Sequence, residues 1–115
     1  MTRVLITFPN ERWINRALVP VALRLLRDPR YEVDLRLPVA TPFENNLHQI
    51  VGTVLREGFD FWLSVDRDNP PIRNPLDLVE LDLDIVGLPT PVWHYRGGPR
   101  ERPIYWNAYR YDPAV

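Results

Sequence analysis

The chain has 115 residues, 45% of them apolar and 25% charged, and a formal net charge of −1. This length supports one domain with a single core, and the composition is globular rather than disordered. The charge gives no electrostatic case for nucleic-acid binding, and the lack of cysteine excludes disulfides and zinc–sulfur sites. We find no signal-peptide pattern and no membrane-spanning apolar run, so we expect a soluble cytoplasmic protein.

The first third of the chain predicts a strand, a helix and a second strand. Arg3–Phe8 (RVLITF) is a largely apolar, β-branched run closed by Pro9, which is typical of a strand buried on both faces. A helical stretch over Trp13–Arg27 contains Pro20, so this helix is either kinked or starts late. Tyr31–Leu37 (YEVDLRL) alternates like a half-buried or edge strand.

The clearest helix signal lies in the middle of the chain. The segment Thr41-Pro-Phe-Glu44 is a capping box with proline at the first helical position, and Gly58 supplies the stop. Phe59–Val65 is nearly all apolar, so it is predicted to be the third strand and the central one. Asn74 caps a short helix that reaches about Leu81.

The last third predicts one more strand and a hairpin. Asp84–Leu88 (DIVGL) is the fourth expected strand, and Val92–Arg96 and Pro103–Tyr111 flank a Gly97-Gly98-Pro99 turn in an aromatic β-hairpin. Aromatic residues of this kind favour core or interface packing, so copies of the chain could pair through the hairpin. We therefore expect a single domain over 1–115, with an α/β core over about 1–90 and the hairpin over about 91–111.

Alternation of strands and helices predicts an α/β fold with a mainly parallel, three-layer Rossmann-like sheet. Ligands of such sheets bind outside the carboxyl ends of the strands, where the strand order reverses. Three loops leave these ends, and we expect all of them to gather on one rim. They are Pro9–Arg12, Pro38–Phe43 and Asp66–Asn69.

Two carboxylates, Asp66 and Asp68, follow the third predicted strand at a spacing of two residues. A hard divalent cation such as Mg²⁺ or Mn²⁺ takes one or two carboxylates together with phosphate oxygens and water. The alternative is an ordinary solvated turn, because Asn69-Pro70-Pro71 is itself turn chemistry. Taken alone, the two aspartates favour the turn.

The order of the segments resembles the nucleotide-binding half of GT-A-type glycosyltransferases, particularly the family 2-like group, over roughly residues 3–93. The resemblance rests on four segments, ITFPNERW, FENNLHQIVGTVLREG, FDFWLSVDRDNPP and LDLDIVGLPTPVW. It implies a GT-A fold, a nucleotide-diphosphate sugar as donor substrate, and transfer of the sugar to an unknown acceptor. It also implies that Asp66 and Asp68 bind the diphosphate through Mn²⁺ or Mg²⁺.

The resemblance assigns further contacts to the loop after the first strand. Pro9, Asn10 and Glu11 would meet the base or ribose of the nucleotide. Arg67 departs from the family pattern, where a small or acidic residue is more usual, and would either contact phosphate directly or weaken metal binding. The family's acceptor-binding half, which usually supplies the catalytic base, has no counterpart here, so catalytic residues stay unassigned. The alternative is a non-catalytic nucleotide-sugar-binding or structural protein.

Asn45, Asn46 and His48 lie in the first turns of the predicted middle helix, close to the expected rim. Free N–H groups there favour an anion, which makes Asn45 a candidate substrate contact. Ordinary capping and solvent exposure are the preferred interpretation of Asn45 and His48. His94 in the hairpin is interpreted in the same way, as an ordinary strand position.

Overall fold

The computed structural model describes residues 1–8, 14–39, 42–66, 70–88, 91–93 and 104–106. The chain divides into two units, Met1–Leu83 and Asp84–Val115, and each is described by itself. The first unit is an α/β arrangement that contains the sheet, both α-helices and a 3₁₀ helix. None of the helices in the described ranges is long and apolar enough to cross a membrane.

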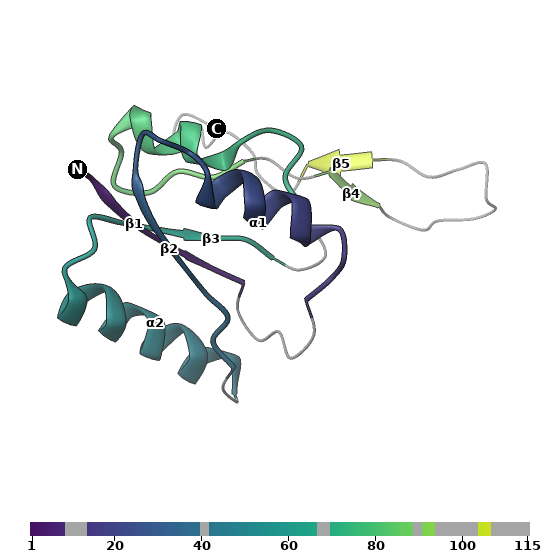
Figure 1. Ribbon diagram of the computed structural model, residues 1–115. Coiled ribbons are helices and arrows are strands. Elements are labelled where there is room, and N and C mark those ends of the chain that lie inside the picture. Colours follow the sequence, from purple (N-terminus) through teal and green to yellow (C-terminus); the bar gives the residue numbers. More distant parts are fainter. Residues whose placement is uncertain (9–13, 40–41, 67–69, 89–90, 94–103, 107–115) are drawn as a thin grey trace, which may run out of the picture. The chain divides into compact units, whose positions relative to one another are not determined.

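Three parallel strands form the sheet of the first unit, in the order β2-β1-β3 (Figure 1). They are β1 (Arg3–Thr7), β2 (Glu32–Arg36) and β3 (Phe61–Ser64). The parallel α/β expectation is confirmed in this part of the chain. The prediction that Phe59–Val65 forms the central strand is wrong, because β1 pairs on both sides and β3 pairs only with β1 among the described residues.

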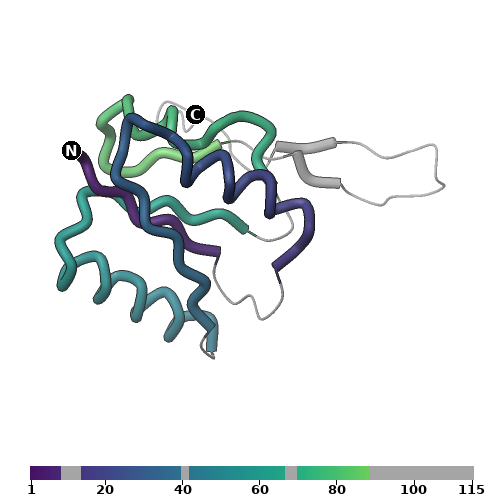
Figure 2. Tube along the Cα trace, in the orientation of Figure 1, coloured from purple at the N-terminus to yellow at the C-terminus, as the bar shows by residue number. Residues whose placement is uncertain are grey.

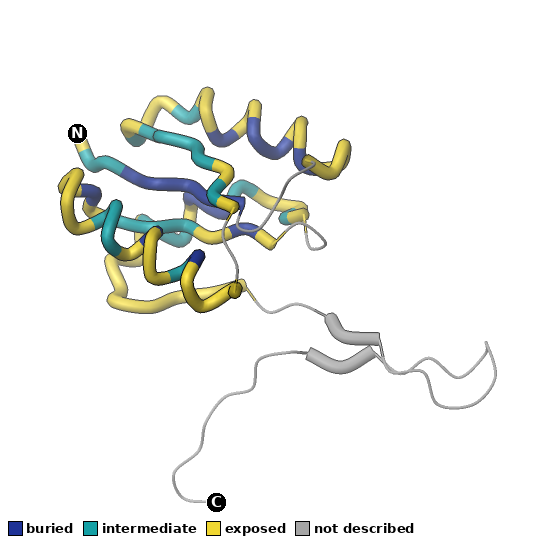
Figure 3. The backbone as a smooth tube through the Cα atoms, turned by 90° about the horizontal axis from the view of Figure 1, so that it is seen from below, coloured by how far each residue is buried: buried dark blue, intermediate teal, exposed yellow. Residues whose placement is uncertain are grey.

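Burial is greatest along β1, where four of five residues are buried (Figure 3). Successive side chains of a strand point to opposite faces, so β1 contributes to two cores. Val4 and Ile6 belong to the larger core on one face, while Leu5 packs with Ile50 and Phe59 on the other. An apolar run without alternation therefore reflects helices on both faces of the sheet.

The first helix, α1 (Leu18–Leu26), starts late, as one of the two alternatives for Pro20 required. Pro20 is the third helical residue, in the first turn, where a missing N–H removes no intrahelical bond. The inward-facing residues of α1 close the larger core. They are Leu18, Val21, Ala22 and Leu25.

The second helix, α2 (Phe43–Glu57), ends as predicted at Gly58. Gly58 has φ of 70°, a left-handed conformation that glycine adopts without a Cβ penalty, and its N–H donates to the carbonyl of Val54. The start differs from the predicted capping box. Pro42 occupies the N-cap instead of the first helical position, no side chain caps the helix, and Thr41 lies outside the described residues.

The two helices lie on opposite faces of the sheet (Figures 1 and 2). From β1, α1 leads to a neighbour on one side, and from there α2 leads back across β1 to the other side. Two crossovers of the same hand that run in opposite directions must pass over opposite faces. The arrangement of the helices thus follows from the strand order.

The strand β2 is a half-buried edge strand, as its alternation predicted. Val33 and Leu35 pack against the core beneath α1. The other face of β2 is charged, and Arg36 there forms ion pairs with Asp34 and with Glu57 at the end of α2. α2 therefore covers β1 and β3 with apolar contacts but meets β2 through charges.

The predicted short helix is present as a 3₁₀ helix, η1 (Pro75–Leu81). Asn74 is its N-cap, and the Asn74 side-chain oxygen accepts a hydrogen bond of 3.0 Å from the backbone N–H of Leu76. Leu76 is completely buried in the same core as α1. η1 and α1 therefore share one face of the sheet.

In the second unit, the predicted strand at Asp84–Leu88 is not formed. Its residues are exposed, with Ile85 94% exposed, and a strand needs a partner to satisfy its backbone groups. Further along, β4 (Pro91–Trp93) and β5 (Ile104–Trp106) pair antiparallel. The predicted turn at Gly97-Gly98-Pro99 and the remainder of the expected hairpin lie outside the described residues.

Candidate functional site

The three parallel strands finish at the same level, so their carboxyl ends form one edge of the sheet. Thr7 pairs with Arg36 of β2 on one side and with Ser64 of β3 on the other. The order of the strands reverses at β1, since the chain adds β2 on one side of it and β3 on the other. In doubly wound sheets, a reversal of this kind marks the usual ligand-binding crevice, between the loops that follow the two strands.

Asp66 is the described residue of the predicted metal pair, and it lies at this edge. The residue before it, Val65, is buried, and its N–H donates a 3.0 Å hydrogen bond to the carbonyl of Thr7. The Asp66 side chain is exposed and has no hydrogen-bond or ion-pair partner among the described residues. A carboxylate directly after this bonded residue, without a partner in the part of the chain that the structure describes, is chemically available to a cation.

The other predicted contacts are divided between described and undescribed positions. Asn45 is exposed on the first turn of α2, where its backbone N–H donates to the carbonyl of Pro42. Five residues of the hypothesis, in two loops, lie outside the described residues. They are Pro9, Asn10 and Glu11 in the loop after β1, and Arg67 with Asp68 in the loop after β3.

Within the described ranges, there is no group of three or more His, Cys, Asp or Glu side chains that could hold a metal ion. Of the two aspartates expected to hold Mn²⁺ or Mg²⁺, only Asp66 falls within those ranges. A single protein carboxylate can serve a hard cation only when most of the other ligands come from phosphate and water.

Two buried polar side chains organise this edge of the sheet: Asn46, which the sequence places near the expected rim, and Thr7, which sequence reasoning did not select. The hydroxyl of Thr7, a residue only 1% exposed, accepts a 2.9 Å hydrogen bond from the indole N–H of Trp62. Asn46 is fully buried, and its amide donates a 2.9 Å hydrogen bond to the carbonyl of Pro38, just beyond β2. The available signal was a polar residue at an inward position of an apolar strand or helix.

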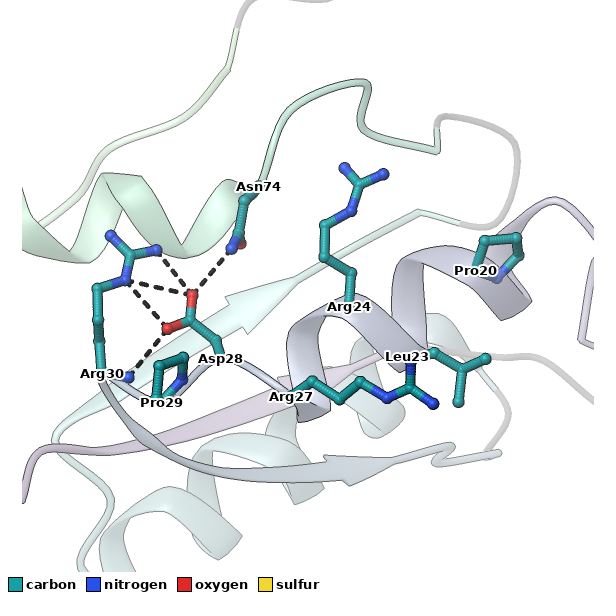
Figure 4. Close-up of a pocket in the computed structure, with 8 residues that line it drawn as sticks. All are labelled: Pro20, Leu23, Arg24, Arg27, Asp28, Pro29, Arg30 and Asn74. Carbon is teal, nitrogen blue, oxygen red and sulfur yellow. Dashed lines mark hydrogen bonds and ion pairs between the residues drawn. The ribbon is translucent and has the colours of Figure 1, made fainter.

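Away from this edge, an open depression of about 730 Å³ lies beside α1 (Figure 4). Part of its lining is a hydrogen-bonded cluster that joins the end of α1 to the start of η1. The Asp28 carboxylate accepts hydrogen bonds from the backbone and side chain of Arg30, the shortest at 2.7 Å, and from the Asn74 amide at 2.8 Å. We refer to Asp28, Arg30 and Asn74 as the clasp.

The guanidinium of Arg30 in the clasp pairs with three carboxylates, that of Asp28 and two more on η1. Arg30 also forms ion pairs of 2.7 Å with Asp77 and with Glu80 on η1. The side-chain hydrogen bond from Arg30 holds the pKa of Asp28 well below the usual range, against the opposing effect of burial. The same bond raises the pKa of Arg30. The Asp28 side chain is only 4% exposed and fully bonded, so its chemistry here is structural.

The comparisons with known proteins give no assignment, since no family model, no curated protein and no solved structure matches this chain.

Proposed function

We propose that the chain binds a nucleotide-diphosphate sugar at the carboxyl edge of β1 and β3 and transfers the sugar to an acceptor. The observation that carries this proposal is the parallel pairing of β1 with β3, which places the strand ends at Thr7 and Ser64 side by side at a reversal of strand order. In this view, the sheet is the start of a three-layer Rossmann-like domain of the GT-A type, carried by a cytoplasmic protein. Pairing of copies through an aromatic C-terminal hairpin belongs to the same proposal.

The residues have separate roles in this site. Asp66 and Asp68 hold Mn²⁺ or Mg²⁺ against the diphosphate, a role supported by the exposure of Asp66 at the end of β3. Pro9, Asn10 and Glu11 contact the base or ribose, Asn45 lies at the rim, and Arg67 reaches the phosphates. When bound, the cation would neutralise the charge that builds up on the diphosphate as it leaves.

The proposal is tested by thermal-shift measurements with nucleoside diphosphates and their sugar conjugates, with and without Mn²⁺. We expect a rise in Tm that needs both nucleotide and metal, and that is lost in Asp66→Asn and Asp68→Asn. Asp60→Asn is the matched control, because Asp60 is an exposed aspartate just before the other end of β3. Its role as acceptor for the N–H of Arg3, at 2.9 Å, can be taken over by an amide oxygen.

Each outcome has a distinct meaning. Stabilisation together with release of free nucleotide from a sugar conjugate supports transfer. Stabilisation without turnover, under any acceptor supplied, favours the non-catalytic nucleotide-sugar-binding alternative. If no nucleotide raises Tm, or if the Asp66 and Asp68 variants respond like Asp60→Asn, the metal–diphosphate site is wrong.

A further inference from the structure

The outer side of α1 exposes a stripe of large aliphatic side chains. Val19, Leu23 and Leu26 are 42%, 47% and 48% exposed. Their spacing of four and three residues places them on one side of the helix. The inward-facing stripe is fully accounted for by the core, so these three residues form a second apolar surface.

Arginines flank this stripe, and acidic residues are missing from it. Arg16, Arg24 and Arg27 are all exposed, and the sequence from Ile14 to Arg27 contains no Asp or Glu. The next carboxylate along the chain, Asp28, is paired with Arg30 in the clasp, and Arg30 also pairs with Asp77 and Glu80 of η1. Segment 14–27 therefore contributes arginines and no carboxylates, even though the chain as a whole has a net charge of −1.

The arginines also border a hollow. Leu23, Arg24 and Arg27 line the open depression beside α1, and Figure 4 shows Leu23 next to Arg27 while Arg24 extends toward the segment before Asn74. The guanidinium of Arg27 has no hydrogen-bond or ion-pair partner among the described residues. That of Arg24 makes one long contact, 3.4 Å, to the carbonyl of Ile72. Both guanidinium groups can therefore donate hydrogen bonds to a phosphate.

We propose that the outer face of α1 docks on a bilayer surface that contains anionic phospholipids. An exposed aliphatic stripe flanked by arginines matches the two layers of a bilayer surface, acyl chains below and phosphate groups above. Each arginine near an anionic surface strengthens binding about fivefold. A nucleic acid would match the arginines but would leave Val19, Leu23 and Leu26 without an apolar partner. The face does not depend on the nucleotide-sugar site, which lies at the sheet edge.

The test is co-sedimentation of the full chain with vesicles of mixed phosphatidylcholine and phosphatidylserine, compared with vesicles of pure phosphatidylcholine. We expect binding to the mixed vesicles that weakens as salt is added. Arg24→Gln combined with Arg27→Gln should reduce the partition coefficient about 25-fold. Arg56→Gln, at an exposed arginine of α2, is the matched control and should bind like wild type.

Leu23→Gln distinguishes a membrane from other anions, because it removes apolar contact without changing charge. It should weaken vesicle binding several-fold and leave binding to a soluble polyanion, such as polyglutamate, unchanged. Circular dichroism melting of each variant confirms that the fold is retained. Equal binding to pure phosphatidylcholine, equal losses in Arg56→Gln and the double variant, or full vesicle binding by Leu23→Gln would each overturn the proposal.

Discussion

The indole N–H of Trp62 in β3 donates a 2.9 Å hydrogen bond to the hydroxyl of Thr7, the buried last residue of β1. The register pairs Trp62 with Leu5, so the bond runs diagonally, two residues forward along the central strand. It fixes side chains of the two strands that end at the candidate site. A polar residue here is tolerated because its one buried hydroxyl has a donor.

Thr7→Val should therefore destabilise the protein while preserving the shape of the side chain. The substitution leaves the Trp62 N–H without its acceptor, at an expected cost of about 1–2 kcal/mol in the free energy of unfolding. Thr53→Val in α2 is the control, since the Thr53 hydroxyl donates to the carbonyl of Gln49 in its own helix. Urea denaturation should show a lower midpoint for Thr7→Val only; equal midpoints would mean that the Trp62 bond contributes nothing.

The clasp predicts part of the pH dependence of stability. The pKa of Asp28 is lower in the folded chain than in the unfolded one, so the unfolded state takes up the proton first as the pH falls. The stabilisation is complete above the ordinary aspartate range and is lost progressively below about pH 4. Asp28→Asn should be less stable than wild type at neutral pH, by about 1–3 kcal/mol, and should lose less stability on acidification.

Denaturation midpoints between neutral pH and pH 2 measure this difference. Glu57, whose pKa is lowered by its hydrogen bond to Arg36, contributes in the same direction, so Asp28→Asn flattens the profile only in part. Asp84→Asn, at an exposed aspartate of the second unit, should follow the wild-type curve. Parallel curves for Asp28→Asn and wild type would show that the clasp does not carry the acid sensitivity.

The two glycines of α2 should respond to alanine with opposite signs. Gly58→Ala places a Cβ at φ of 70° and should cost about 1 kcal/mol or more. Gly52→Ala adds a good helix former inside the helix and should stabilise by up to about 1 kcal/mol. The new Cβ would approach the Arg56 guanidinium to 2.9 Å, but a flexible side chain can move away. Thermal melts that shift in the same direction for both variants would contradict this.

The neighbouring asparagines of α2 should separate structural from ligand effects. Asn46→Ala removes the buried amide that donates to Pro38 and should lower stability by about 1–2 kcal/mol. Asn45→Ala removes an exposed side chain and should leave the unfolding midpoint within about 0.5 kcal/mol of wild type. If Asn45 contacts a nucleotide, its variant loses ligand-induced stabilisation without losing intrinsic stability. A large drop in the midpoint of Asn45→Ala would contradict its assignment to the surface.

Local signals in the sequence located most elements of the first unit. The glycine at the end of α2, the asparagine before η1 and the proline that delays α1 each act on the backbone next to them, so their effects can be predicted from neighbouring residues. The alternation in β2 also predicted its half-buried state. The capping box failed by one position at Pro42, because helix starts depend on how the preceding loop packs as well as on local capping.

Strand order was not predictable in the same way. Phe61 and Leu63 pack beneath α1 and Trp62 packs against α2, so β3 is apolar on both faces although only β1 pairs with it among the described strands. Side-chain patterns report which faces of a strand are covered, whereas strand order concerns its hydrogen-bonding edges. The expected strand at Asp84–Leu88 failed for a related reason, since β propensity alone supplies no partner. Of the candidate site, the sequence could propose a shared rim, but the adjacency of β1 and β3 required the fold.

The central position of β1 has a consequence for how the chain is made. β1 precedes both of its partners, β2 and β3, in the sequence. During synthesis, the first edge of this apolar strand can be paired only after Arg36 has been added, and the second only after Ser64. Until then, the emerging chain carries an unpaired, aggregation-prone strand edge, and this interval is when a chaperone would have most to protect.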